Sequence, residues 1–192
     1  TNGLAQYGAA AVFSGTAVMT NVTVDGNVAS GYHSPGVAIR VDGGASLSAR
    51  SCTFSNNRPC NKVLGFNHTS SSTGCRMKGS SYTSYASSDG LKGGAIATTG
   101  GSTWIEDCTF VGNFAAYGGA LFVGSSSGSV EVKKSKFSSN EANSYGQGGA
   151  GSALYVETGA SMVVNSSIFA DNPCVGRCAA GTGVAFVKSA GS

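Results

Sequence analysis

A short motif that recurs along the chain most limits what this chain can fold into. Phe is followed three residues later by Asn at 54–57, 110–113, 137–140 and 169–172, and residues 24–27 repeat the pattern with Val in place of Phe. The asparagines are separated by 30, 56, 27 and 32 residues. Recurrence at a nearly constant spacing of about 30 residues is typical of solenoids, in which each unit stacks on its neighbour.

A second motif alternates with the first in a fixed order. It places Ala before an apolar residue and reads Gly-Gly-Ala-apolar at 93–96 and 118–121. Looser copies occupy 11–12, 37–39, 152–154 and 184–186. The asparagine spacing of 56 has the length of two periods but contains the motifs of one, so we interpret residues 58–92 as an insertion. About six units result, and the last is unfinished.

Apolar residues within a unit form two short alternating runs. The residues seven and five before Phe share one face, and the residue two before Phe shares a face with Phe. The spacing of three residues between the two runs breaks the period of two, which predicts two short strands joined by a bend. The Ala-apolar motif predicts a third strand. The predicted inward residues of that third strand are Val12, Ile39, Ile96, Leu121, Leu154 and Phe186. Their outward neighbours are predicted to be Phe13, Arg40, Ala97, Phe122, Tyr155 and Val187.

Three short strands per unit predict an all-β fold, a parallel β-helix with one long loop insertion. Coils stacked about 4.8 Å apart join their strands into parallel sheets around a narrow core. A β-sandwich also has many short strands but does not place Phe and Asn in one register repeatedly. The predicted core column is Val24, Phe54, Phe110, Phe137 and Phe169. The predicted hydrogen-bonded amide ladder is Asn27, Asn57, Asn113, Asn140 and Asn172.

Composition excludes several classes of protein. Charged residues are 11% of the chain and the net charge is +3, which is too weak and scattered for nucleic-acid binding. The chain has no run of about 18 apolar residues, so no membrane-spanning helix is predicted. A hydrophobic content of 41% permits a core, and a neutral chain with 30 glycines and 6 cysteines indicates an extracellular location. No residue pattern calls for a cofactor.

Gly-Gly-Ala-apolar alternating with Phe-x-x-Asn resembles the repeat of the polymorphic outer-membrane-protein family. The resemblance covers nearly the whole chain outside 58–92 and is best at 94–113 and 119–140. It implies a right-handed β-helix of the pectin-lyase-like type that is displayed at a cell surface and linked to adhesion. It implies no catalytic residues.

Neither end of the chain shows a capping helix, and the unit that begins at Gly183 stops before its second strand. An open coil end exposes unpaired backbone groups, which natural solenoids cap. We therefore expect residues 1–192 to be a β-helix fragment of a longer protein. Further coils, another domain or another protein subunit would continue the stack.

The cysteines are candidates for disulfide bonds. Cys60 and Cys75 lie in the insertion and could close its loop, and Cys174 and Cys178 could close a small ring. Cys52 and Cys108 occupy equivalent positions in adjacent coils, within the distance that a disulfide spans. The alternative for this last pair is two free thiols that act as small core residues. Zinc binding is not expected, because no pair of Cys-x-x-Cys motifs occurs.

Three asparagines begin an Asn-x-Ser/Thr acceptor sequence for N-linked glycans. They are Asn21, Asn67 and Asn165. Asn67 lies in the insertion and is the best candidate of the three. Asn21 and Asn165 fall at the bend between strands, where an Asn can simply serve the turn.

Catalysis is not predicted. Polysaccharide hydrolysis needs two carboxylates at a set separation, and the carboxylates of this chain do not recur in one outward column. Glu106 and Asp107 form the one adjacent pair, and His33 and His68 lie in loops without an obvious partner. We expect a non-catalytic structural or adhesive module of a cell-surface or filament-forming protein, with cell-surface glycans as a further expected partner. The alternative is a carbohydrate-active or carbohydrate-binding domain on the pectin-lyase-like scaffold.

Overall fold

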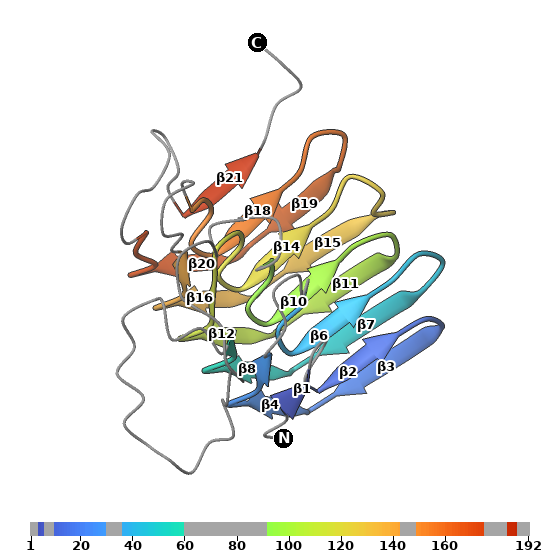
Figure 1. The fold of residues 1–192 in the computed structure, drawn as a ribbon, viewed down its shortest axis with the longest axis horizontal. Coiled ribbons are helices and arrows are strands. Elements are labelled where there is room, and N and C mark those ends of the chain that lie inside the picture. Colours follow the sequence, from blue (N-terminus) through green and yellow to red (C-terminus); the bar gives the residue numbers. More distant parts are fainter. Residues whose placement is uncertain are drawn as a thin grey trace, which may run out of the picture.

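The computed structural model describes residues 4–5, 10–29, 36–59, 92–142, 149–174 and 184–187. These residues form β-strands and no helix, and the strands of successive coils lie side by side along one axis (Figure 1). No helix long and apolar enough to cross a membrane occurs in this part of the chain.

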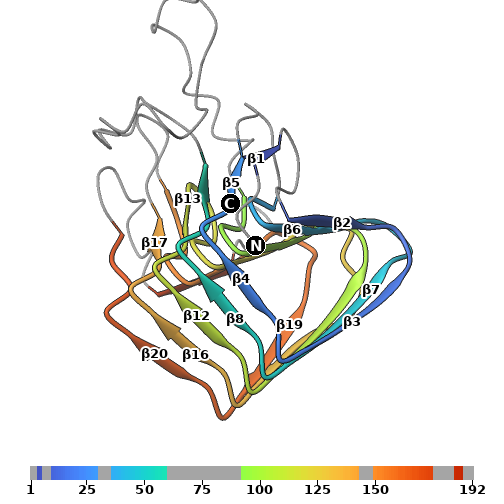
Figure 2. The same cartoon turned by 90° about the horizontal axis from the view of Figure 1, so that it is seen from below.

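Three parallel sheets enclose a narrow interior with a roughly triangular cross-section (Figure 2). Sheet I consists of β2 (Ala11–Phe13), β6 (Ile39–Val41), β10 (Ile96–Thr98), β14 (Leu121–Val123), β18 (Leu154–Val156) and β21 (Ala185–Val187). Sheet II consists of β3 (Thr16–Thr20), β7 (Ser46–Arg50), β11 (Ser102–Glu106), β15 (Val130–Lys133) and β19 (Met162–Asn165). Sheet III consists of β4 (Thr23–Asp25), β8 (Thr53–Ser55), β12 (Thr109–Val111), β16 (Lys136–Ser138) and β20 (Ile168–Ala170). The predicted parallel β-helix is confirmed.

The predicted core column is also confirmed. Phe54, Phe110, Phe137 and Phe169 pair in register through sheet III, and Val24 pairs with Phe54. The ring centroids of successive phenylalanines are 4.8, 4.6 and 4.9 Å apart, with interplanar angles of 10°, 1° and 10°. This spacing equals the distance between parallel strands, so the sheet geometry itself imposes the ring stack.

A left-handed backbone residue makes the bend between sheets II and III in each of the five coils for which the structure describes both strands. Positive φ angles of 59°, 53°, 53°, 46° and 51° occur at Asn21, Ser51, Asp107, Lys134 and Ser166. All five lie three residues before the Phe column. One residue in this conformation turns the chain and shifts the side-chain alternation by one position, which explains the odd step in the sequence pattern.

The Gly-Gly pair before sheet I is required by close backbone contacts. Gly118 has a φ of 63°, and a Cβ atom there would lie 2.2 Å from the carbonyl oxygen of Leu121. A Cβ atom on Gly119 would lie 2.1 Å from the carbonyl oxygen of Ser152 in the next coil. The first glycine therefore permits the turn, and the second permits the close approach of two coils.

The prediction of which residue faces inward was wrong for the first and last strands of sheet I. Ala11, not Val12, pairs with Ile39, and Ala185, not Phe186, pairs with Leu154. Val12 is consequently 47% exposed. In both strands a small Ala occupies the inward register position, whereas the pattern assigned that position to the bulkier residue that follows it.

A short fourth ladder follows the asparagines, in addition to the three predicted strands. It comprises β1 (Leu4–Ala5), β5 (Val28–Ala29), β9 (Arg58–Pro59), β13 (Phe114–Ala115) and β17 (Glu141–Ala142). The Phe114 N–H donates to the carbonyl oxygen of Asn57 at 2.9 Å, which continues the ladder from β9 to β13. At the edges of the proposed insertion, Arg58 and Pro59 therefore belong to a coil, and Lys92 pairs with Tyr117. Residues 60–91 lie outside the described residues.

Candidate functional site

The asparagine ladder is the most extensive polar arrangement among the described residues. Four of its members are fully buried, and Asn172 is 9% exposed. The Oδ1 atom of Asn113 accepts hydrogen bonds from the backbone N–H and the Nδ2 of Asn57, at 3.2 and 2.8 Å. Its Nδ2 donates to Asn140 Oδ1 and to the carbonyl oxygen of Phe54, each at 2.9 Å. The same bonds recur from Asn27 to Asn172, so the predicted ladder is confirmed.

A second ladder runs through the column two residues before Phe. The Cys52 N–H donates to Cys108 Sγ at 3.3 Å, and the Cys108 N–H donates to Ser135 Oγ at 3.1 Å. The Ser135 N–H in turn donates to Ser167 Oγ at 3.2 Å. Cys108, Ser135 and Ser167 thus each accept the N–H of the preceding coil, so these positions favour small residues with lone pairs.

The structure contradicts a disulfide between Cys52 and Cys108. Both cysteines are free and buried, as the alternative interpretation predicts. The Cys108 sulfur accepts the N–H of Cys52 in the way that the Ser135 hydroxyl accepts the N–H of Cys108, and the Cys52 thiol donates to the carbonyl oxygen of Arg50 at 3.2 Å. Burial raises the pKa of Cys108 to about 12, so this thiol stays protonated at neutral pH.

Cys174 forms a disulfide bond. Cys60, Cys75 and Cys178 lie outside the described residues. The proposed pairs Cys60–Cys75 and Cys174–Cys178 therefore stay predictions.

The adjacent carboxylates Glu106 and Asp107 have separate structural roles. The Glu106 carboxylate lies 3.0 Å from the Arg50 guanidinium and 3.6 Å from Lys134 Nζ, and its side chain is 11% exposed. Asp107 is the bend residue of its coil and is exposed. The bend directs the two side chains to different surroundings, and Glu106 binds neighbouring coils together.

Other described carboxylates also have polar partners. Asp25 accepts hydrogen bonds from Ser55 Oγ at 2.6 Å and Asn56 Nδ2 at 2.9 Å, and these bonds lower the pKa of Asp25. Glu131 pairs with Lys133 at 2.9 Å. Lys133 and Lys134, which lie close to Lys136 in the sequence, are therefore both engaged in ion pairs.

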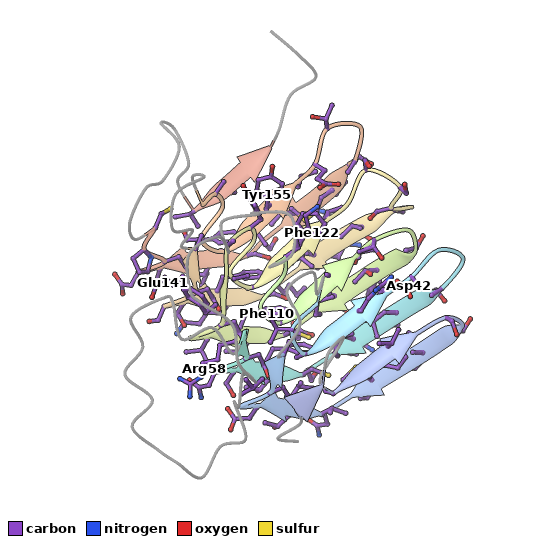
Figure 3. All side chains as sticks on the ribbon, viewed as in Figure 1. Asp42, Arg58, Phe110, Phe122, Glu141 and Tyr155 are labelled. Atoms are coloured by element: carbon purple, nitrogen blue, oxygen red, sulfur yellow. The ribbon has the colours of Figure 1, made fainter. Side chains whose placement is uncertain are left out.

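An aromatic cluster covers the outer side of sheet I at β10, β14 and β18, where the sequence predicted outward-facing residues. Phe122 is 1% exposed and Tyr155 is 6% exposed. Their rings stack on adjacent coils with centroids 5.6 Å apart (Figure 3), and Tyr117 packs edge-on against Tyr155. Burial raises the pKa of Tyr155 to about 12. The missed signal is the presence of bulky aromatic residues at the same register position in consecutive coils.

An ion pair crosses this cluster. Lys92 Nζ lies 4.8 Å above the centre of the Phe122 ring and 2.8 Å from Glu157 Oε1. Glu157 Oε2 also accepts the N–H of Ser125 at 3.1 Å. Lys92 precedes β10 and Glu157 follows β18, so the pair links coils that are not adjacent.

Trp104 lies on the outer side of sheet II. It is the one tryptophan of the chain, is partly buried, and pairs with Ser48 and Glu131 in the flanking strands. Its neighbours Thr103 and Ile105 are buried, so the alternation of the strand directs the indole away from the core.

The predicted glycan acceptors differ in position. Asn21 and Asn165 are both exposed, and Asn67 lies outside the described residues. The histidines His33 and His68 also lie outside them. Within the described ranges, no three His, Cys, Asp or Glu side chains form a group that could hold a metal ion.

The stacked parallel sheets and the internal ladders define a single-chain β-solenoid. A family model for the right-handed beta helix region matches residues 3–190, so the chain belongs to this family. The family includes enzymes and non-enzymes. No curated protein and no solved structure matches the chain.

Proposed function

We propose that this chain is a non-catalytic structural or adhesive module of an extracellular, cell-surface or filament-forming protein. The asparagine ladder carries the proposal. It devotes a continuous column of buried amides to holding successive coils in register, which is what a rigid stacking unit requires. The resemblance to the polymorphic outer-membrane-protein repeat supports a surface location.

The carboxylates support a structural role as well. Glu106 is held by Arg50 and Lys134, and Glu157 is held by Lys92. A general acid or base must reach the bond that it cleaves, whereas these groups are engaged in contacts between coils.

We also propose further coils of the same protein or other protein subunits as partners. The described strands pair in parallel and in register over five or six coils, and this arrangement can repeat along the same axis.

Two experiments test this proposal. Antibody labelling of intact and permeabilised cells of the source organism is expected to detect the protein on intact cells. Labelling that requires permeabilisation would exclude a surface role.

Incubation of the purified chain with acidic polysaccharides, with and without calcium, is expected to release no unsaturated sugars. Release that Glu106→Gln abolishes would establish an enzyme instead.

Trp104 favours carbohydrate binding as a second candidate function. An indole on a flat sheet, flanked by Ser48 and Glu131, offers an apolar ring with polar neighbours, which suits stacking against a sugar ring. Retention of the chain on an immobilised glycan, lost in Trp104→Ala but kept in Val18→Ala, would favour this function. Val18 is the matched control because it lies in the same outward column and is 73% exposed. Equal retention of both variants would count against it.

A further inference from the structure

The described asparagines separate into buried and exposed groups, and the glycan acceptor sequences fall only in the exposed group. The exposed members are Asn21, Asn56 and Asn165, of which the first and third begin Asn-x-Ser/Thr. No ladder asparagine does so. The residues two positions after the ladder asparagines are Ala29, Pro59, Ala115, Ala142 and Cys174. The fold thus keeps acceptor sequences away from amides that the core needs.

The local geometry of Asn165 leaves its side chain available. Asn165 is the last residue of β19, and the left-handed residue of that bend is Ser166, with a φ of 51°. The Ser167 hydroxyl donates to the backbone carbonyl of Asn165 at 3.0 Å. The side-chain amide of Asn165 makes no hydrogen bond within the described part of the chain. The turn therefore does not use this amide.

Asn21 lies at the same corner of the first coil. It has a φ of 59°, and its backbone N–H donates to the carbonyl oxygen of Arg50 at 3.0 Å. Among the described residues, its side-chain amide also has no hydrogen-bond partner. Asn56, the exposed asparagine without an acceptor sequence, instead donates its amide to Asp25. Among the three exposed asparagines, the two that begin an acceptor sequence are therefore the two whose side-chain amides make no hydrogen bond to a described residue.

We propose that Asn21 and Asn165 carry N-linked glycans, an inference that rests on the proposed extracellular location. In the transfer, the Asn Nδ2 loses a proton and forms a bond to C1 of the first sugar of a lipid-pyrophosphate-linked oligosaccharide. The bond from C1 to the pyrophosphate oxygen breaks, and the lipid pyrophosphate leaves. Both amides lie at the exposed corner between sheets II and III, so an attached glycan extends sideways from the stack without displacing a core residue.

The test is to express the whole chain with a secretion signal in cultured eukaryotic cells. Peptides are analysed by mass spectrometry after enzymatic deglycosylation in heavy-oxygen water, which marks each formerly occupied Asn as labelled Asp. Occupancy is expected at Asn21 and Asn165. Asn21→Gln and Asn165→Gln should each remove one deglycosylation-sensitive step in gel mobility, and the matched control Asn56→Gln should remove none.

Secreted, folded protein with Asn21 and Asn165 unmodified would overturn the inference, and occupancy at one of them alone would overturn it for the other. Asn67 is scored as a separate peptide. The surface-labelling experiment on the source organism is independent of this result. Absence of labelling on intact cells would therefore refute the proposed function. Unmodified Asn21 and Asn165 in the chain secreted from cultured cells would refute only the proposal that they carry glycans.

Discussion

At the scale of single residues, stability depends on buried polar side chains that bond to the next coil. The sequence predicts the column of asparagines and the bonds between their amides, but not the bonds that each amide makes to backbone groups. Asn113 illustrates the difference, because its spacing predicts the amide bonds to Asn57 and Asn140, whereas its bond to the Phe54 carbonyl oxygen is seen only in the structure. An amide is suited to this position because it both donates and accepts hydrogen bonds along the axis.

Replacing Asn113 with Ala is expected to destabilise the fold by about 3 kcal/mol or more. The change removes the acceptor of Asn57 N–H and a donor to Phe54 and Asn140, and each buried group left without a partner costs about 1–3 kcal/mol. Urea unfolding followed by circular dichroism measures the loss. Asn56→Gly is the control, because that position is exposed and Gly26 and Gly112 occupy it in other coils with positive φ. A similar loss in both variants would contradict the role of the ladder.

Replacing Cys108 with Ser should be tolerated at neutral pH, because Ser135 fills the same column in the next coil. In the wild type, the Cys108 pKa is raised from 9.0 to about 12 in the fold. The unfolded chain therefore loses this proton at lower pH than the folded chain, and wild-type stability falls as pH rises from 9 toward 12.

Cys108→Ser removes this contribution, so its free energy of unfolding should decline less steeply over the alkaline range. Urea titrations at several pH values between neutral and alkaline compare the two proteins. An identical slope in wild type and variant would show that Cys108 does not contribute to the alkaline loss of stability.

At the scale of the element, the turns determine where each strand begins. The bends between sheets II and III accept Asn, Ser, Asp and Lys in the left-handed conformation, so no single residue type marks them in the sequence. The turn before sheet I is more restrictive, because its carbonyl oxygens leave no room for a Cβ atom. Because of this restriction, the turn before sheet I can be recognised in the sequence by its Gly-Gly-Ala motif. The bends between sheets II and III can be recognised only by a break in the alternation of apolar and polar residues.

Gly118→Ala is expected to destabilise the fold by about 2–4 kcal/mol, because it combines a strained φ with a contact to the Leu121 carbonyl. Gly43→Ala is the matched control in another loop. A Cβ atom on Gly43 has no atom within 4 Å, so this variant should be neutral or slightly more stable. Thermal unfolding of both variants measures the difference, and equal melting temperatures would contradict the steric account.

At the scale of the whole molecule, the repeat made the architecture predictable and left the surface unpredictable. The Phe and Asn columns follow directly from their spacing, because stacking places equivalent residues one above another. The outer side of sheet I does not follow from spacing. Whether Phe122 faces solvent depends on what packs over the sheet, and Lys92 and Tyr117 come from outside the strands that the pattern defines. Nor could periodicity distinguish a disulfide from two thiols at Cys52 and Cys108, because both fit the same distance.

The stacked architecture also predicts that stability depends on position along the axis. Phe110 is fully buried between the rings of Phe54 and Phe137, whereas Phe169 is partly buried and stacks on Phe137. Phe110→Ala is expected to cost about 3–5 kcal/mol, as for other buried aromatic residues. Phe169→Ala should cost clearly less, because less of its ring is buried.

Hydrogen exchange distinguishes these two variants by where protection is lost. In a solenoid each coil packs mainly against its neighbours, so Phe169→Ala should reduce amide protection in β19 and β20 while β8 and β12 stay protected. Phe110→Ala should reduce protection on both sides of the central coil. Uniform loss of protection throughout the chain in Phe169→Ala would mean that the stack unfolds as one cooperative unit, and that the stability of a coil cannot be assigned to its nearest neighbours.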